Sequence, residues 1–294
     1  MSLPIEEKLA ECAAKVEAAL DEYLSPEYVG DSGLAEAMRY STLGGGKRIR
    51  AFLVLEFAKL FGGSEAAAIP FACALEMVHA YSLIHDDLPC MDDDELRRGK
   101  PTCHIKYGEA NALLAGDSLL TYAFEVASSN KFVSDKAVRL AVGELARQAG
   151  TLGMAGGQYI DLGLTVDSYD ELKKLHMMKT SALIKAACLL GYYAATDTPT
   201  EENIKRLSVY AEAVGLAFQI HDDLLDVKSD TATLGKNVGS DEKNGKKTVL
   251  RFKSIFEAED EESLLTLLAV EAVSDYIGSE VLCKLALWLM ERKK

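Results

Sequence analysis

Proline is scarce in this chain, with six widely spaced residues among 294. Scarce proline, combined with abundant alanine, leucine, glutamate and lysine, favours long helices over short strands joined by tight hairpins. The hydrophobic content of 49% is high enough for a substantial core. We therefore predict an all-α fold and exclude one that is built from many short strands.

Cysteine pairs and long apolar runs are also lacking. The six cysteines include no CxxC pair, and we expect free thiols in a reducing compartment. No uninterrupted apolar stretch reaches the roughly 18 residues of a membrane span, and no basic start precedes an apolar signal core. We expect a cytoplasmic protein without stable membrane insertion.

Positive charge is in deficit, since the formal net charge is -14. This charge argues against a nucleic-acid partner, because binding to phosphate backbones requires a basic surface. A small anionic ligand stays possible where lysines, arginines or metal ions overcome the negative potential locally.

Apolar residues recur at helical spacing along most of the chain. The ranges predicted to be helical are 5–24, 34–40, 49–61, 66–87, 110–128, 135–152, 169–195 and 201–227, with further helices within 250–292. The polar segment Lys228–Lys247 is predicted to be a mobile loop.

The pentapeptide IHDDL occurs twice, at 84–88 and 220–224, each time after an apolar stretch. In the second copy, Gln219, Asp222, Asp223 and Asp226 share one helix face. The ten residues that precede them include no lysine or arginine, so three carboxylates crowd together and repel one another. A hard divalent cation with oxygen ligands, such as Mg²⁺, is the natural counter-charge.

In the first copy, a straight helix would turn Asp92 about 120° away from Asp86 and Asp87. Pro89 interrupts the helical hydrogen bonds, so a bulge over 88–91 is predicted to return Asp92 to their side. Glu76 and His79 continue a polar stripe along the same apolar helix, which we expect to face a cavity. A solvated acidic helix end is the alternative for either motif alone.

Basic residues follow glycines in LGGGKRIR, 43–50, where a helix start would favour anions. The stretch lacks the Ser or Thr of a phosphate-binding Walker loop, and an ordinary helix cap is the alternative. LRRGKP, 96–101, adds two arginines directly after the acidic run. These either pair with the neighbouring acids or bind phosphate through the guanidinium fork.

Together these motifs resemble the trans-isoprenyl diphosphate synthases, most of all the bacterial farnesyl diphosphate synthases. DDLPCMDDDELRRGKPT and QIHDDLLD resemble the family's two aspartate motifs. GGKRIR, GGQYIDL at 156–162, MKTSALI at 178–184 and LGK at 234–236 follow in the family's order. The resemblance implies one polyprenyl synthetase domain over 1–294, a bundle of long helices around a central apolar cavity. It also implies a homodimer.

The resemblance implies three Mg²⁺ ions, and the aspartates implied to bind them are Asp86, Asp87, Asp92, Asp222, Asp223 and Asp226. It implies that Arg97, Lys179 and Lys236 bind the allylic diphosphate. The residues implied to bind isopentenyl diphosphate are Lys47, Arg50, His79 and Arg98. Thr180 and Gln219 match positions near the reacting carbons and are expected, with Lys179, to act in catalysis. Lys246 matches a lysine of a closing loop, and the C-terminal ERKK resembles a basic tail that folds over the site.

The residues themselves favour this chemistry, because ionising an allylic diphosphate develops charge that metal ions and lysines stabilise. Tyr81 and Ser82 lie more than one helical turn before Asp86, where a bulky side chain can form the floor of a tail pocket. In the resembling family an aromatic residue there accompanies a fifteen-carbon product, so farnesyl diphosphate is expected. The alternative is that Tyr81 is an ordinary core aromatic and that residues elsewhere, such as Met77 or Phe124, set the depth of the pocket.

Three other functions remain open. A geranylgeranyl diphosphate synthase would share the catalytic residues and differ in pocket depth. A non-catalytic subunit of a heteromeric synthase would be expected to lose an aspartate cluster or the arginine pair, and both are present here. A class I terpene cyclase would use one aspartate motif with a different second metal site. Ala51, where the family commonly has proline, and the segment after Lys247 depart from the family pattern.

Overall fold

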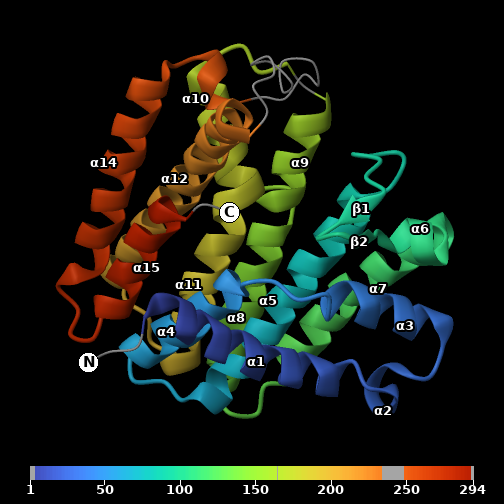
Figure 1. Ribbon diagram of the computed structural model, residues 1–294. Helices are drawn as coiled ribbons and strands as arrows, with labels where there is room; N and C mark the ends of the chain where they lie inside the picture. The colour runs from blue at the N-terminus through green and yellow to red at the C-terminus, as the bar shows by residue number, and fades with distance from the viewer. Residues whose placement is uncertain (1–3, 164, 234–247, 293–294) are drawn as a thin grey trace. The chain divides into compact units, whose positions relative to one another are not determined.

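The computed structural model describes residues 4–163, 165–233 and 248–292, without the side chains of 228–233 (Figure 1). Its helices confirm the all-α prediction, with one short hairpin as the sole strand pair in the described part. The chain divides into two compact units: Met1–Leu145 with Ala186–Pro199, here called unit 1, and Ala146–Lys185 with Thr200–Lys294, unit 2. The single domain expected from the sequence stays a prediction.

Unit 1 is built around the apolar helix α5. Its elements are α1 (Ile5–Tyr23), α2 (Pro26–Val29), α3 (Gly33–Thr42), α4 (Ile49–Leu60), α5 (Glu65–Asp86), β1 (Leu96–Arg97), β2 (Lys100–Pro101), α6 (Cys103–Tyr107), α7 (Glu109–Ser128), most of α8 (Asp135–Ala149) and the end of α11 (Ala182–Ala195). Helices α4 and α7 both pack against α5. Phe52, Phe57, Phe71 and Leu119 are fully buried in this core.

Helix α5 begins where Ser64 caps it, because the Ser64 hydroxyl accepts a hydrogen bond from the Ala67 amide at 3.2 Å. By length and composition alone, α5 is apolar enough to cross a membrane, although Glu76 interrupts the apolar run. About 72% of its most apolar window is buried, as in the core helix of a soluble domain. Its hydrophobicity is thus explained by packing inside unit 1.

Unit 2 contains boundaries between helices that the sequence patterns predicted to be continuous. Its elements are the end of α8, α9 (Met154–Gly163), α10 (Tyr169–His176), the π-helix η1 (Met177–Ser181), the start of α11, α12 (Glu201–Thr233), the 3-10 turn η2 (Val249–Arg251), α14 (Ile255–Ser274) and α15 (Glu280–Glu291). Ser168 and Ser254 form capping boxes with Glu171 and Glu257 at the starts of α10 and α14.

Two sequence predictions need correction here. The predicted helix 169–195 is three elements, because η1 interrupts it with wider hydrogen bonding. The predicted loop Lys228–Lys247 is helical up to Thr233, where α12 ends, and residues 234–247 lie outside the described part. Helix α9 and the hairpin were not predicted.

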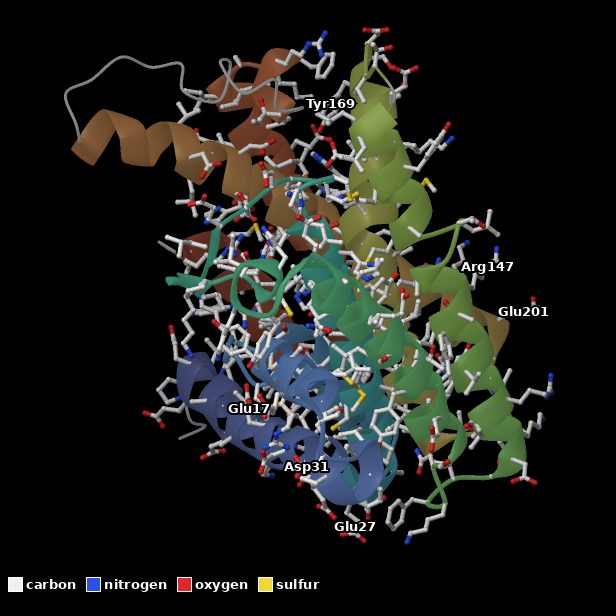
Figure 2. The ribbon with its side chains drawn as sticks, turned by 90° about the vertical axis from the view of Figure 1, so that its right-hand side faces the viewer. Glu17, Glu27, Asp31, Arg147, Tyr169 and Glu201 are labelled. Atoms are coloured by element: carbon white, nitrogen blue, oxygen red, sulfur yellow. The ribbon has the colours of Figure 1, made fainter. Side chains whose placement is uncertain are left out.

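The acidic character of the chain is carried by its surface. Exposed carboxylates include Glu27 and Asp31 in unit 1 and Glu201 in unit 2, all labelled in Figure 2. The core of unit 2 is apolar, with Leu172, Leu175 and Leu224 among its buried residues. These acidic residues therefore lie outside the apolar core of unit 2.

Candidate functional site

The first aspartate motif is a tight turn at the end of α5. The helix ends at Asp86, and Pro89, which has no amide hydrogen, follows three residues later. The Asp92 amide donates to the Asp86 carbonyl at 2.9 Å, and Asp93 takes a left-handed φ of 54°. The backbone thus returns Asp92 to Asp86, as predicted. It does so through a turn that follows the end of the helix at Asp86, whereas a bulge within the helix over 88–91 was predicted.

Arg97 holds Asp87 with its guanidinium fork. Its Nε donates to both carboxylate oxygens, at 2.8 and 3.0 Å, and its Nη2 donates to Oδ1 at 2.6 Å. Burial lowers the pKa of Arg97, but the bonds and charge of Asp87 outweigh it and raise that pKa above its ordinary value. One arginine of the LRRGKP motif therefore pairs with the acidic run.

Arg98 lies at the tip of the β1–β2 hairpin, where Arg97 pairs with Lys100. The two loop residues, Arg98 at φ 54° and Gly99 at φ 74°, both have the left-handed backbone of a type I′ turn. The Arg98 guanidinium donates to the Gly45 carbonyl, and a Cβ on Gly46 would come within 2.9 Å of it. Gly46 of LGGGKRIR thus makes room for the hairpin arginine.

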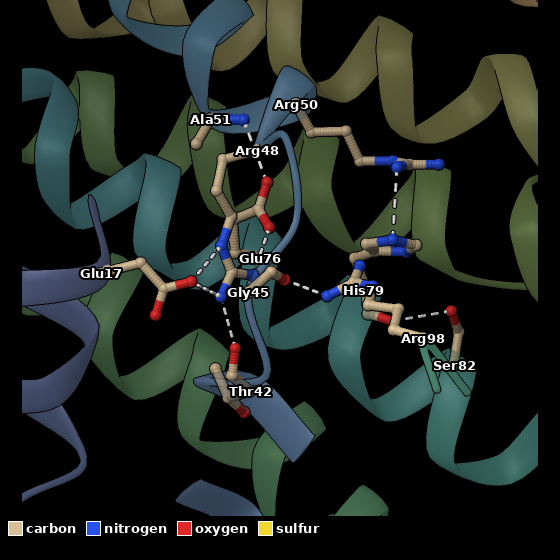
Figure 3. A network of polar contacts seen from close by, with 10 residues as sticks. All are labelled: Glu17, Thr42, Gly45, Arg48, Arg50, Ala51, Glu76, His79, Ser82 and Arg98. Carbon is tan, nitrogen blue, oxygen red and sulfur yellow. Dashed lines mark hydrogen bonds and ion pairs between the residues drawn. The ribbon is translucent and has the colours of Figure 1, made fainter. Parts of the chain in front are cut away.

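Arg48 of the same motif is structural. It caps α4 in a left-handed conformation, φ 48°, and its guanidinium donates to Glu17, to the Thr42 carbonyl and, at 2.9 Å, to Glu76 (Figure 3). Glu76, only 2% exposed, also accepts the Ala51 amide at 3.1 Å. The expectation that Glu76 faces a cavity is therefore wrong, because its carboxylate is buried and hydrogen-bonded to Arg48 and to the first turn of α4.

Arg50 and His79 form the next layer of the network. Arg50 Nη1 lies 3.3 Å from His79 Nε2, and the buried Arg50 Nε has no hydrogen-bond partner among the described residues (Figure 3). Burial, followed by the charge of Arg50, lowers the pKa of His79 well below its ordinary value, so its ring is neutral. Two predicted anion-binding residues are thus in contact.

A pocket opens beside the arginine pair within unit 1, with about 480 Å³ of empty space that includes open solvent. Asp87, Arg97, Arg98 and Lys100 are its charged lining residues, and Ala80, Leu83 and Ile84 of α5 form an apolar wall. The two predicted chain-length residues, Tyr81 and Ser82, are not among its lining.

Tyr81 is buried, with 9% of its surface exposed, and its ring meets the His85 ring edge-on at a centroid distance of 5.6 Å. Burial, followed by the charge of Asp86, raises the pKa of Tyr81. The Ser82 hydroxyl donates to the His79 carbonyl of its own helix at 2.9 Å. Of the two predicted chain-length residues, Tyr81 has the bulkier side chain.

In unit 2 the π-helix η1 presents Lys179 and Thr180. Lys179 Nζ donates to Asp161 of α9 at 2.6 Å, and the Thr180 hydroxyl donates to the Gln219 side chain of α12. Gly157 of the GGQYIDL motif lets α9 pack on η1, since a Cβ there would lie 2.4 Å from the Lys179 amide nitrogen. The three predicted catalytic residues are therefore fixed by neighbouring elements.

The second aspartate motif pairs with an arginine of the C-terminal ERKK, a partner that the sequence reasoning did not assign. Arg292, from the C-terminal ERKK, pairs with Asp222, and its carbonyl contacts His221 Nε2 at 2.9 Å. Asp223 accepts the Val249 amide at 2.7 Å. Burial raises the pKa of Asp222, with Asp226 adding to the rise and Arg292 and His221 opposing it. The sequence signal for this contact was the resemblance of ERKK to a basic tail, but the resemblance did not say which acid Arg292 would meet.

A family model for polyprenyl synthetases matches residues 31–277. The Escherichia coli farnesyl diphosphate synthase is 43% identical over 291 residues, covering 92% of this chain and 97% of the relative. The chain belongs to the polyprenyl synthetase family. It is thus a prenyltransferase of isoprenoid biosynthesis, as predicted.

Two further members of the polyprenyl synthetase family are similar to this chain. A chloroplastic geranylgeranyl pyrophosphate synthase of Arabidopsis thaliana is 48% identical over 247 residues, covering 81% of this chain and 67% of the relative. The crystal structure of a Zymomonas mobilis FPP/GFPP synthase has a TM-score of 0.85 at 33% identity and covers 97% of this chain and 98% of that one. The fold is therefore shared with solved family members.

Family members are generally metal-dependent. Among the side chains that the structure describes, those of 4–163, 165–227 and 248–292, no three from His, Cys, Asp or Glu form a ready-made metal cage. Mg²⁺ commonly binds through one or two carboxylates together with substrate phosphates, and the all-oxygen donors of the Asp86–Asp92 turn fit that mode. Lys236 and Lys246, predicted to bind diphosphate and close the site, lie outside the described residues.

Proposed function

We propose that the protein condenses isopentenyl diphosphate with dimethylallyl and then geranyl diphosphate, giving (2E,6E)-farnesyl diphosphate and pyrophosphate. One arrangement in unit 1 carries the proposal. The acidic turn at Asp86–Asp92 leads directly into the hairpin whose Arg97 contacts Asp87 and whose Arg98 contacts the glycine loop. Carboxylates for a metal and guanidinium groups for diphosphate are thus held side by side.

Lys47, Arg50, His79 and Arg98 are proposed to bind isopentenyl diphosphate. The buried Arg50 Nε supports this, since it has no acceptor in the described part of the chain and an anion would supply one. The neutral His79 ring is able to donate one hydrogen bond without adding charge. Arg98, whose pKa is lowered by burial and by Arg48, would also gain from an anionic partner.

Arg97, Lys179 and Lys236 are proposed to bind the allylic diphosphate. The six aspartates of the two motifs are proposed to bind three Mg²⁺ ions, which when bound would stabilise the charge of the departing diphosphate. Thr180 and Gln219 are hydrogen-bonded to each other, so their side chains are oriented before substrate arrives. Lys246 is proposed to help close the site.

Tyr81 supports the fifteen-carbon product, because a buried aromatic ring one turn below the aspartates would limit the length of the growing tail. Geranylgeranyl diphosphate synthase is the second candidate, since the Arabidopsis relative is 48% identical over the matched region. The non-catalytic subunit stays the alternative if no condensation occurs. We also propose a single functional domain, a homodimer and a cytoplasmic location.

The test is a product assay on the purified protein. It would be incubated with isopentenyl diphosphate and dimethylallyl diphosphate, with Mg²⁺ or with EDTA, and the dephosphorylated products would be separated by gas chromatography and identified by mass spectrometry. We expect farnesol only with Mg²⁺. Geranylgeraniol as the main product would replace the proposed chain length, and no condensation from either dimethylallyl or geranyl diphosphate would contradict the enzyme itself.

Two tyrosine variants test the tail pocket in the same assay. Tyr81→Ala should lengthen the product, because it removes the ring that limits the tail. Tyr28→Ala is the matched control, since Tyr28 is 55% exposed in α2 and outside the proposed site. Identical product lengths in both variants would mean that Tyr81 is an ordinary core residue.

A further inference from the structure

Tyr81 is linked to α7 by a chain of side-chain contacts. His85 lies one helical turn after Tyr81 on α5, and the two rings meet at an angle of 79° with a centroid distance of 5.6 Å. This edge-to-face geometry is favourable for aromatic pairs. Side chains four residues apart on a helix lie one above the other, so His85 is placed to support the Tyr81 ring.

His85 is itself fixed against α7. Its Nε2 lies 3.0 Å from the Leu113 carbonyl, and α7 packs along α5 in unit 1 (Figure 1). Gly116 makes this approach possible, because a Cβ at that position would lie 2.2 Å from His85 Nε2 and 2.4 Å from its Cδ2. The imidazole of His85 thus packs directly against the backbone of α7.

We propose that Gly116 and His85 are positioning residues that hold Tyr81 as the floor of the tail pocket and so set product length. The proposal rests on the proposed function and deepens it. Tyr81 alone has several side-chain rotamers, and a floor that changes rotamer no longer stops elongation at one length. Contact with a His85 ring that is held against the α7 backbone restricts that freedom. Product length then depends on a glycine that never touches the substrate.

Two opposite substitutions test this contact chain. His85→Ala opens a space beside Tyr81, while Gly116→Ala pushes the imidazole off α7 and away from the Leu113 carbonyl. Both should release Tyr81, so the ratio of twenty-carbon to fifteen-carbon product should rise roughly fivefold, the effect expected for the loss of one aromatic contact. Because Gly116 acts only through the imidazole, the double variant should give the same ratio as His85→Ala alone.

Gly143→Ala is the matched control, since Gly143 also lies inside a helix, α8, but a Cβ there would meet nothing within 4 Å. Its product ratio should equal that of the unmodified protein. Circular dichroism melting curves would identify any variant that does not fold. If Gly116→Ala fails to fold, His85→Ala, which removes atoms instead of adding them, still tests the contact with Tyr81.

The product ratio separates positioning from a structural role, because a protein that is merely less stable makes less of the same product. An unchanged ratio in His85→Ala would overturn the proposal, as would a shift to shorter products or effects that add in the double variant. If the unmodified protein makes no condensation product, the proposed function has failed. If it condenses normally and the variants keep its ratio, only the role of His85 and Gly116 has failed.

Discussion

Asp87 and Asp86 are adjacent in sequence but have different environments. Asp87 is 3% exposed, and Arg97 covers both of its oxygens. A metal ion at Asp87 has to compete with a bidentate guanidinium, whose hydrogen bonds to a carboxylate are among the strongest in proteins. Asp86 instead shares its turn with Asp92. We therefore expect the two aspartates of the pair to contribute unequally to metal affinity.

His176 gives a test of pH dependence at the scale of one residue. It is buried in α10, and burial lowers its pKa from the ordinary 6.5 to about 4, with Asp161 opposing the shift and Lys179 adding to it. The unfolded chain therefore binds more protons than the folded one between these pH values. The free energy of unfolding should fall as pH drops from 6.5 to 4, by about 3 kcal/mol.

Replacing the ring removes this linkage. His176→Gln should flatten the dependence of the unfolding free energy on pH between 4 and 6.5, measured by urea denaturation at several pH values. A variant whose pH dependence matched that of the unmodified protein would show that another group causes the loss of stability in acid.

At the scale of the helix, the start of α4 depends on a carboxylate from α5. Glu76 accepts the Ala51 amide and the Arg48 guanidinium, both buried. Removing Glu76 from this buried ion pair leaves Arg48 with only the partly exposed Glu17 carboxylate and the Thr42 carbonyl. Glu76→Gln should lower the free energy of unfolding by about 3–5 kcal/mol in urea denaturation.

The chain offers an exposed ion pair as the matched control for Glu76. Lys15 and Glu65 are 2.7 Å apart, and both side chains are more than half exposed. Exposed pairs contribute about 0–1 kcal/mol, so Glu65→Gln should have a small effect. Equal losses in the two variants would contradict the importance of burial at Glu76.

The π-helix η1 is the other element whose geometry serves the candidate site. Widening the helix at 177–181 changes the direction of the side chains that follow, and such bulges are frequent at functional sites. Gly157 allows α9 to lie against it, and Asp161 of α9 then reaches Lys179. The GGQYIDL motif thus has two roles: Gly157 lets α9 pack on η1, and Asp161 binds Lys179.

At the scale of the whole molecule, a charge of -14 favours cations in general, so a specific metal site has to be separated from screening. Mg²⁺ with inorganic pyrophosphate binds the folded chain in the proposed function. At about 100 times the dissociation constant this adds about 2.7 kcal/mol, which should raise the melting temperature by roughly 5 °C.

Potassium chloride at equal ionic strength is the control for screening. It reduces repulsion among all carboxylates but cannot bridge carboxylate and pyrophosphate. An equal rise in melting temperature with the potassium salt would mean that the aspartate motifs are only a charged surface. Asp86→Asn and Asp222→Asn should each reduce the rise that Mg²⁺ and pyrophosphate produce.

Local patterns predicted most helices well because helix formation depends on neighbouring residues. Predicted range 66–87 corresponds to α5, and 49–61 corresponds to α4. The patterns missed the break between α10 and α11, since η1 remains helical and its residues keep an apolar period. They also missed α9, where Gly157 packs against the backbone of η1 and Gly156 packs against the Thr151 carbonyl.

The sequence by itself determined the all-α class, the aspartate motifs and the return of Asp92 after Pro89, because each depends on composition or on residues a few positions apart. Only the tertiary structure decided which charges pair. Arg48 with Glu76, Arg97 with Asp87 and Arg292 with Asp222 are 28, 10 and 70 residues apart. Such pairs form when packing removes side chains from water, and periodicity along the chain has no information about which acid each arginine will meet.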